Sequence, residues 1–347
     1  MANRTISENI NQAISDFKGI KQAIIDRGIE IPEGTPTSEY GAKIEEIKGI
    51  VDTTDLKKLI ERTTATPNLP NDLTKIGEYA FYRYTNLALT ELPSGLTSIG
   101  DSAFIFCKNL ALTKLPSGVT SIGSGAFQDC SKLALTELPS GLTSIESNAF
   151  RSCKNLALTE LPSGLTSIWN GAFYSCTNLA LTELPSGLTS IGDSAFQYCS
   201  KLALTELPSG LTSIEGNAFA SCTNLALTEL PSGLTSIGNS AFQYCSKLAL
   251  TELPSGLTSI EGNAFASCTN LALTELPSGL TSIGSNAFYS CTGLTTITFK
   301  GKPKTIASNA FRGCTNLTEI RVPWASGEVA NAPWGAKNAS ILYSQQV

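Results

Sequence analysis

The chain has 347 residues, with 24 basic and 29 acidic side chains, ten cysteines and no histidine. Its net charge of −5 and its scattered lysines provide no basic stripe, which argues against a nucleic-acid-binding surface. No stretch approaches about 18 consecutive apolar residues, so we expect no membrane insertion. The first residues lack the apolar segment of a signal peptide and the last ones lack an anchoring tail, so we expect a protein that is not exported by the usual route.

Residues 1–50 have a helical pattern. A capping-box sequence begins at Thr5, and from Ile6 onward apolar residues recur every three or four positions until Gly28. A second amphipathic segment begins at about Ser38, after a loop rich in proline and glycine. The pattern predicts an N-terminal helical hairpin.

This hairpin has more apolar surface than two short helices can bury between themselves. We therefore expect residues 1–50 to form a homo-oligomer or to attach to a partner. The alternative is a simple cap for the segment that follows. Residues 51–68 are predicted to form a linker with a capping helix of their own at Asp55–Arg62, which weakens that alternative.

From residue 69 onward the sequence repeats every 23 residues without a change of register. Each repeat has an isoleucine that is followed five residues later by a phenylalanine, from Phe81 to Phe311. A fixed period in the twenties is typical of a solenoid, in which each repeat is one coil of a stack. The isoleucines are Ile76, Ile99, Ile122, Ile145, Ile168, Ile191, Ile214, Ile237, Ile260, Ile283 and Ile306.

One unit, Cys199 to Ser221, illustrates the expected coil. Pro208 and Gly210 favour a turn, Leu211 to Ile214 is predicted to be a short strand, and Asn217 to Ser221 a single turn of helix. One such coil cannot bury enough apolar surface to fold alone, so neighbouring coils must complete its core. The sequence therefore predicts an α/β solenoid of eleven 23-residue coils.

The ten cysteines all occupy one position of the repeat, where Tyr84 stands in the first coil. Without histidine or a C-x-x-C motif we expect no metal site and no cofactor. Stacked coils place equivalent residues about 5 Å apart, which leaves disulfides open as an alternative. We expect instead a buried column of reduced thiols, because a cytoplasmic product is kept reduced.

The unit L-x-L-x-x-L-P-x-x-L-T-S-I-x-x-x-A-F-x-x-C resembles the BspA-type leucine-rich repeat. The resemblance covers residues 69–317 and implies a curved, right-handed solenoid with a parallel sheet on one side. The segment L-A-L-T-E-L departs from the more usual pattern, which the last full repeat carries at Leu294–Phe299. Because of this departure, the sequence does not determine the length and position of the first strand of each coil.

Two further segments resemble parts of tail and fibre-like structural proteins of phages and prophages from gut Firmicutes. One is I-K-Q-A-I-I-D-R-G-I-E-I-P-E-G-T-P-T-S-E-Y-G-A-K-I-E-E-I, near the N-terminus, and the other is Ile320 to Tyr343. We expect residues 318–347 to form a C-terminal cap in which Trp324 and Trp334 cover the last coil and Ile341 to Tyr343 add a strand.

The chain carries no familiar catalytic motif, so we expect no enzyme. Its one conspicuous polar series is a ladder of glutamates, interrupted by Lys114. Neighbouring carboxylates would have the separation of a retaining glycosidase pair, but this separation recurs at every step. We expect a solvated face, with cation-mediated ligand binding as the alternative. The ladder consists of Glu91, Glu137, Glu160, Glu183, Glu206, Glu229, Glu252 and Glu275.

The copies differ mainly around the Ala-Phe pair, where aromatic residues, arginine and glutamine appear. These residue types favour interfaces, although drift at tolerant positions is the alternative. Units 199–221 and 245–267 are identical, which indicates recent duplication. The predicted ligand-binding residues are Phe106, Gln128, Arg151, Trp169, Tyr174, Gln197, Tyr198, Gln243, Tyr244 and Tyr289.

Together these patterns favour a non-enzymatic recognition protein of a phage or prophage tail or fibre. Its expected partners are a host cell-surface protein or polysaccharide, bound by the solenoid, and other virion proteins, bound through residues 1–50. We therefore expect the protein in the virion or tail particle, assembled in the bacterial cytoplasm. The alternative is a bacterial cell-surface BspA-like adhesin that binds host protein or glycan, and a carbohydrate-active enzyme is the least supported class.

Overall fold

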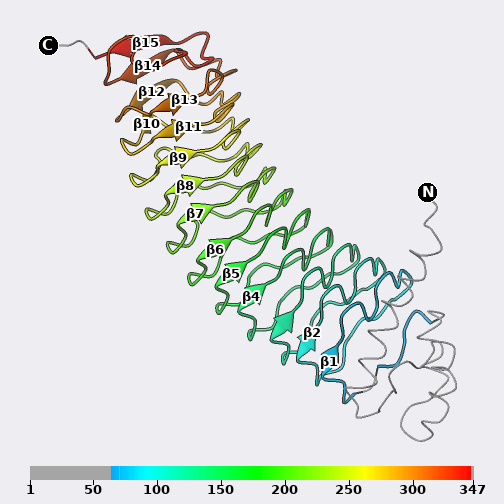
Figure 1. Ribbon diagram of the computed structural model, residues 1–347. Coiled ribbons are helices and arrows are strands. Elements are labelled where there is room, and N and C mark those ends of the chain that lie inside the picture. Colours follow the sequence, from blue (N-terminus) through cyan, green and yellow to red (C-terminus); the bar gives the residue numbers. More distant parts are fainter. Residues whose placement is uncertain (1–63, 70, 345–347) are drawn as a thin grey trace, which may run out of the picture.

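The computed structural model describes residues 64–69 and 71–344, which form a curved stack of coils (Figure 1). The predicted hairpin of residues 1–50 and the predicted capping helix at Asp55–Arg62 lie outside the described residues. Within the described part of the chain no helical segment has the length and hydropathy of a membrane span.

Parallel two-residue strands on one side of the stack form the first ladder. The strand of each coil pairs with the equivalent strand 23 residues later, as in Ser98 with Ser121 and Ile99 with Ile122. The ladder is interrupted between β3 and β4 and between β6 and β7. Its members are β1 (Lys75–Ile76), β2 (Ser98–Ile99), β3 (Ser121–Ile122), β4 (Ser144–Ile145), β5 (Ser167–Ile168), β6 (Ser190–Ile191), β7 (Ser213–Ile214), β8 (Ser236–Ile237), β9 (Ser259–Ile260), β11 (Ser282–Ile283) and β13 (Thr305–Ile306).

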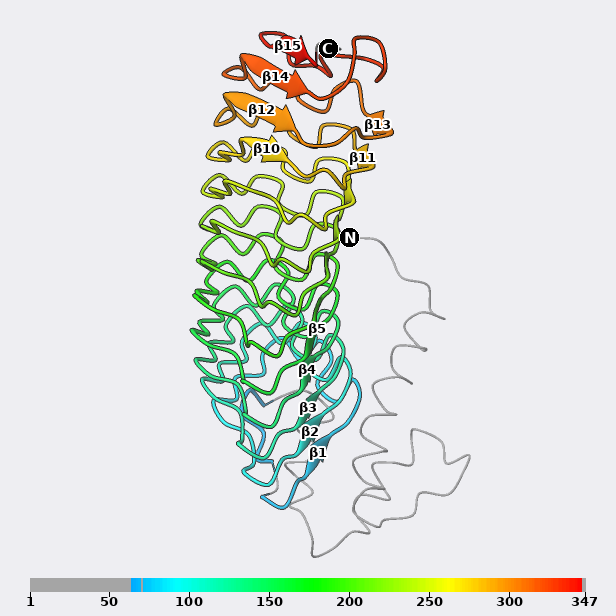
Figure 2. The same ribbon diagram turned by 90° about the vertical axis from the view of Figure 1, so that its left-hand side faces the viewer.

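A second parallel ladder lies on another side of the coils near the C-terminal end (Figure 2). It forms where apolar residues alternate with polar ones, as in Thr296–Phe299, whose isoleucine and phenylalanine are buried. In the central L-A-L-T-E-L coils the buried leucines are three residues apart, as in Leu204 and Leu207, which a flat strand cannot place on one face. The last L-A-L-T-E-L coil forms only the two-residue strand Glu275–Leu276, which pairs with the regular strand Thr296–Phe299 beside it. The members are β10 (Glu275–Leu276), β12 (Thr296–Phe299), β14 (Glu319–Val322) and β15 (Ser340–Tyr343).

The predicted turn of helix at Asn217 to Ser221 is wrong. This segment is a chain of turns in which Asn217 and Ser221 adopt φ values of 54° and 62°. The amide of Phe219 donates to Ala241 of the next coil at 2.9 Å, whereas the amide of Ala220 donates back to Asn217 at 3.0 Å. A helix would direct every amide along its own axis and leave none for the next coil. The described residues contain no helix, so the fold is a β-solenoid rather than an α/β solenoid.

The core contains a continuous column of eleven phenylalanines, from Phe81 to Phe311. Neighbouring rings stack with centroids 5.0 to 5.6 Å apart and planes within 10° of parallel. Between the two ends of the column, each ring is buried because it packs between the rings of the coil above and the coil below.

Beside the phenylalanines runs the column of ten cysteines, which are all buried and unpaired, as the sequence predicts. Each thiol donates to the carbonyl oxygen of the phenylalanine one coil earlier, for example Cys222 to Phe196 at 3.0 Å. Burial raises the pKa of the Cys222 thiol well above 9.0. The thiols therefore act as neutral donors that link adjacent coils.

The C-terminal end closes the core with aromatic side chains. Phe299 contacts Phe311, Trp324 and Trp334 with centroid distances of 6.4, 5.3 and 5.7 Å. Trp334 is fully buried, and its indole donates to the carbonyl of Ala330 at 2.8 Å. Residues Ser340–Tyr343 form β15, which extends the second ladder beyond β14 and contains the strand expected at Ile341 to Tyr343.

Candidate binding surface

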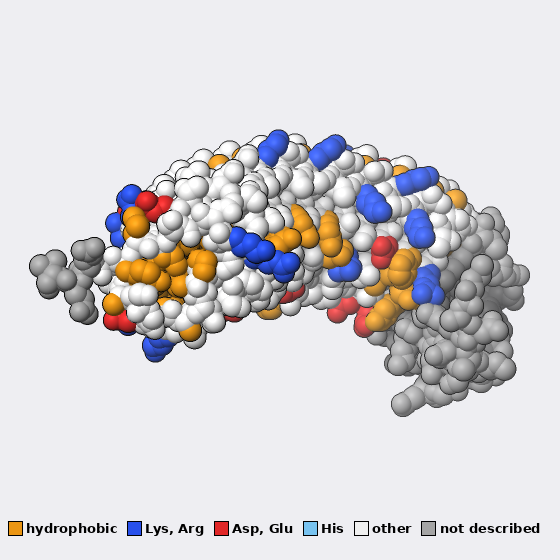
Figure 3. Space-filling model, turned by 90° about the horizontal axis from the view of Figure 1, so that it is seen from above, with side chains coloured by type: hydrophobic (Ala, Val, Ile, Leu, Met, Phe, Trp, Pro, Cys, Tyr) orange, Lys and Arg blue, Asp and Glu red, His pale blue; other side chains and the backbone are white. Residues whose placement is uncertain are grey.

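The turns around each Ala-Phe pair place variable side chains on the surface. The phenylalanine points into the core, and the residue two positions after it usually adopts a positive φ, as in Tyr198 with 64° and Tyr244 with 62°. We call the positions one and two residues after each core phenylalanine, together with the residue after each core isoleucine, the turn ridge. One face of the molecule carries separate groups of hydrophobic side chains with basic side chains among them (Figure 3).

All ten predicted ligand-binding residues lie on the turn ridge, and all are at least partly exposed. The most exposed are Trp169 at 50%, Tyr244 at 53% and Tyr198 at 44%. The structure brings only some of the ten into contact. Only Arg151, Tyr174 and Tyr198 make ring or cation contacts with one another, and the other seven make none with a predicted residue within the described part of the chain.

The central group on the ridge is formed by three predicted residues from consecutive coils. The guanidinium of Arg151 lies 3.9 Å from the ring centroid of Tyr174. Tyr174 in turn meets Tyr198 edge to face, with centroids 5.4 Å apart. Because the cation and the rings hold one another in place, the group offers contact area at a low cost in side-chain entropy.

A second group lies at the N-terminal end of the ridge, and only one of its members, Phe106, is among the predicted ligand-binding residues. Phe106 meets Tyr82 with centroids 6.3 Å apart, and the guanidinium of Arg83 lies 5.4 Å from the Phe106 ring. Tyr79 contacts Tyr82 edge to face at 5.6 Å. The repeat register could have revealed Tyr82 and Arg83, because they stand 23 residues before Ile105 and Phe106.

Two equivalent platforms lie immediately before the duplicated units. Gln197 and Tyr198 stand 46 residues, or two coils, before Gln243 and Tyr244, and both tyrosines have nearly the same φ. The coil between them carries the buried Ala220 at the position equivalent to the glutamines. The ridge thus presents the same pair of side chains twice, separated by a coil with small residues.

The glutamate ladder behaves differently from the turn ridge. Its eight carboxylates are all exposed, and among the described residues no group of three acidic, cysteine or histidine side chains is arranged to hold a metal. Glu275 pairs with Lys300 at 2.7 Å, with both side chains about half exposed. The exposure of these carboxylates favours a solvated face.

The repeat pattern matches the family model described as the BspA type leucine-rich repeat region. The matches cover residues 62–180, 121–249 and 241–331, and so most of the chain. This chain belongs to the BspA-type leucine-rich repeat family. No curated protein matches it.

Among solved structures, a leucine-rich repeat protein from Bacteroides ovatus is 25% identical with a TM-score of 0.55. That match covers 82% of this chain and 85% of the other. A leucine rich cell surface protein from Faecalibacterium prausnitzii is 29% identical with a TM-score of 0.47, covering 73% and 84%. A leucine rich repeat protein from T. pallidum is 31% identical with a TM-score of 0.42, covering 50% and 82%.

Proposed function

We propose that this BspA-type protein is a non-enzymatic recognition protein whose turn ridge binds a polymer or protein on a bacterial cell surface. The observation that carries this proposal is the group of the partly exposed Arg151 and Tyr174 with the exposed Tyr198, and with Trp169 on the same turn as Tyr174. Aromatic and arginine side chains supply most of the binding energy at protein interfaces. The rest of each coil is nearly constant, so specificity has few other places to reside.

The equivalent platforms at Tyr198 and Tyr244 favour an extended ligand. A small ligand would use one platform and gain nothing from the second. A linear polymer with repeating units can engage both, and the second contact then forms at a high effective concentration. The intervening Ala220 and Ser221 leave room for the part of the polymer that joins the two contacts. We therefore favour a repeating surface polysaccharide over a single compact receptor.

The proposed location is the tail or fibre of a phage or prophage, with residues 1–50 attached to the particle. This part of the proposal rests on the two terminal segments that resemble such proteins. The solenoid itself would serve equally well on a virion or on a cell. A surface adhesin of the producing bacterium is the outcome that would replace it.

Cell binding tests the recognition surface. The fluorescently labelled full chain is incubated with a panel of gut bacteria and with their purified surface polysaccharides. The variant Trp169→Ala, Tyr174→Ala, Tyr198→Ala, Tyr244→Ala should lose most binding and keep its melting temperature nearly unchanged. The matched control replaces Glu183, Glu206, Glu229 and Glu252 by glutamine and should bind normally. If the glutamine variant loses binding and the alanine variant retains it, the recognition face is the glutamate ladder.

Immunogold electron microscopy tests the location. After prophage induction, antibodies against the solenoid should label released tail particles, and a chain without residues 1–50 should be absent from them while still binding bacteria. The same deletion variant should remain folded, and light scattering should give it the mass of a monomer if this segment also mediates self-association. Labelling confined to the surface of the producing cell would identify the protein as an adhesin.

A further inference from the structure

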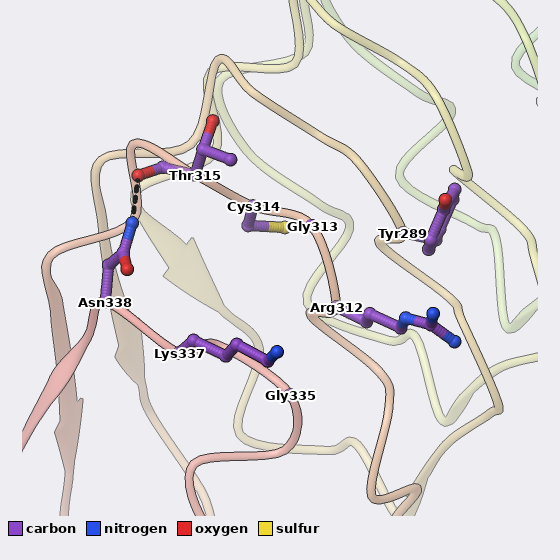
Figure 4. Close-up of a pocket in the computed structure, with 8 residues that line it drawn as sticks. All are labelled: Tyr289, Arg312, Gly313, Cys314, Thr315, Gly335, Lys337 and Asn338. Atoms are coloured by element: carbon purple, nitrogen blue, oxygen red, sulfur yellow. Dashed lines mark hydrogen bonds between the residues drawn. The ribbon is translucent and has the colours of Figure 1, made fainter.

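A shallow pocket lies between the last coils and the C-terminal cap (Figure 4). Its volume is about 250 Å³. Tyr289 and Asn338 lie at opposite ends in this view, with Arg312 and Lys337 between them. The volume is just below the roughly 300 to 1,000 Å³ of sites that enclose a drug-sized ligand, so the pocket suits one small chemical unit.

The pocket is electropositive. Arg312 and Lys337 are both exposed, and no acidic residue is among those that line it. Asn338 connects the cap to the last coil at one end of the pocket, because its side-chain amide donates to the carbonyl of Thr315 at 2.8 Å. Two cations on a concave surface attract an anion more strongly than the same charges on a flat face.

The end of the stack also leaves a backbone donor in the pocket. In the ten preceding coils the amide two residues after the core phenylalanine donates to the next coil, as Ser290 does to Arg312 at 2.8 Å. The equivalent amide of Gly313 makes no hydrogen bond to the cap or elsewhere in the described part of the chain. Gly335 stands where the next coil would supply the acceptor, and its own carbonyl already accepts from Lys337.

Substitutions in this turn are restricted by space as well as by conformation. Gly313 has a φ of 79°, and a Cβ atom there would lie 2.7 Å from the Ser290 hydroxyl oxygen. A Cβ atom on Gly335, whose φ is 85°, would lie 3.1 Å from the Arg312 backbone. Glycine at both positions therefore avoids clashes with the coil beneath and allows the positive φ values of this turn.

We propose that this pocket binds the anionic group of a single unit of an acidic glycan. Arg312 and Lys337 would neutralise the carboxylate or phosphate, the Gly313 amide would donate to one of its oxygens, and Tyr289 would pack against the sugar ring. Charge-assisted hydrogen bonds of this kind are stronger than neutral ones. The site lies at the C-terminal end of the turn ridge, includes the ridge residue Tyr289, and is distinct from the groups around Tyr174 and Phe106. This assignment rests on the proposed recognition of a surface polymer, of which the pocket would bind the end or a charged branch.

Titration of the ¹⁵N-labelled full chain tests the site with three probes: glucuronate, glycerol phosphate and glucose. At least one of the two anionic probes should shift the Gly313 amide resonance, and glucose should not. Tighter binding of glucuronate would indicate a carboxylated polysaccharide, and tighter binding of glycerol phosphate a phosphate-linked wall polymer. Absence of binding by both anions, or equal binding of glucose, would overturn the proposal.

Variants identify the cations. Arg312→Gln and Lys337→Gln should each weaken binding of the anionic probe by about tenfold or more, the loss expected for one charge-assisted hydrogen bond. The matched control is Lys304→Gln, which removes an exposed lysine of the same coil outside the pocket and should leave affinity unchanged. An equal loss in the control would show only a general charge effect. Because all three side chains are exposed, unchanged melting temperatures should confirm that each variant is folded.

Discussion

The central coils and the C-terminal coils share one repeat length but differ in their second ladder. In the central coils, buried leucines such as Leu204 and Leu207 are three residues apart, and no second strand forms. In the last full repeat Ile297 and Phe299 are two residues apart, and a four-residue strand forms. The difference shows that the coil does not depend on this sheet.

Coils of both kinds are joined mainly through their turns. In the central region the amide of Ala203 donates to Leu181 at 3.1 Å, so the leucine segment keeps one link to its neighbour. The turn around each Ala-Phe pair supplies several more, and the cysteine thiol adds another. The extended second ladder is therefore an addition that accompanies closure of the C-terminal end.

The thiol column runs through both regions and should give the largest effect. Burial raises the pKa of nine of these cysteines above the ordinary 9.0. Their contribution to stability is complete below pH 9 and is lost above it, because thiols of the unfolded chain then ionise while the folded ones do not. The free energy of unfolding should fall by about 1.4 kcal/mol per pH unit for each such thiol. Urea unfolding between pH 8 and 11 measures this slope.

The matched control is a variant with Cys222→Ala and Cys245→Ala. Its free energy of unfolding should fall less steeply with pH, by the contribution of two thiols. The ends of the column sharpen the comparison. Burial raises the pKa of Cys314, which is 3% exposed, to about 12. Alkylation followed by mass spectrometry should therefore modify Cys314 before the fully buried central thiols. A slope that is unaffected by removing the two thiols would assign the alkaline effect to other groups.

Removing the cap should produce the next largest effect. Trp334→Ala should destabilise the protein by about 3 to 5 kcal/mol, the range for a large buried aromatic residue, because it opens the core beside Phe299 and Trp324. Thermal unfolding followed by circular dichroism measures the change. Leu342→Ala is the control, since this side chain is 47% exposed on β15 and should change stability little. Equal melting temperatures for the two variants would mean that the stack needs no aromatic closure.

Phe299→Leu gives this coil the leucine that the central coils carry at the same position. The change should cost about 1 to 1.5 kcal/mol, because the edge-to-face contacts of the ring with Phe311 and Trp324 are lost while most of its volume is kept. Urea unfolding measures the cost. In a Trp334→Ala background the same substitution should cost less, because the two side chains are in contact. Full additivity would contradict a coupled cap.

Much of the fold follows directly from the repeat. The isoleucine and phenylalanine columns and the buried thiols are set by position within 23 residues, and the tryptophans of the cap are expected at the open core because they follow the last coil. The sequence at Asn217 to Ser221 favours a turn of helix, because alanine and phenylalanine are compatible with one. Only the neighbouring coil reveals that alternate amides must donate to its carbonyl groups. The pocket could not be predicted, since it depends on the missing partner of Gly313 and on Lys337, which belongs to the irregular cap.

The smallest expected effect separates the two regions through the glutamate ladder. Glu275 lies in β10 and pairs with Lys300 of the next coil at 2.7 Å, whereas Glu229 in a central coil has no ion pair within the described part of the chain. Glu275→Gln should cost at most about 1 kcal/mol, because both partners are about half exposed, and the cost should fall at high salt. Glu229→Gln should be neutral or slightly stabilising, because it relieves repulsion between like charges in neighbouring coils. Urea unfolding of both variants at low and high salt measures the difference, and an equal loss for both would show that the ladder contributes to stability along its whole length.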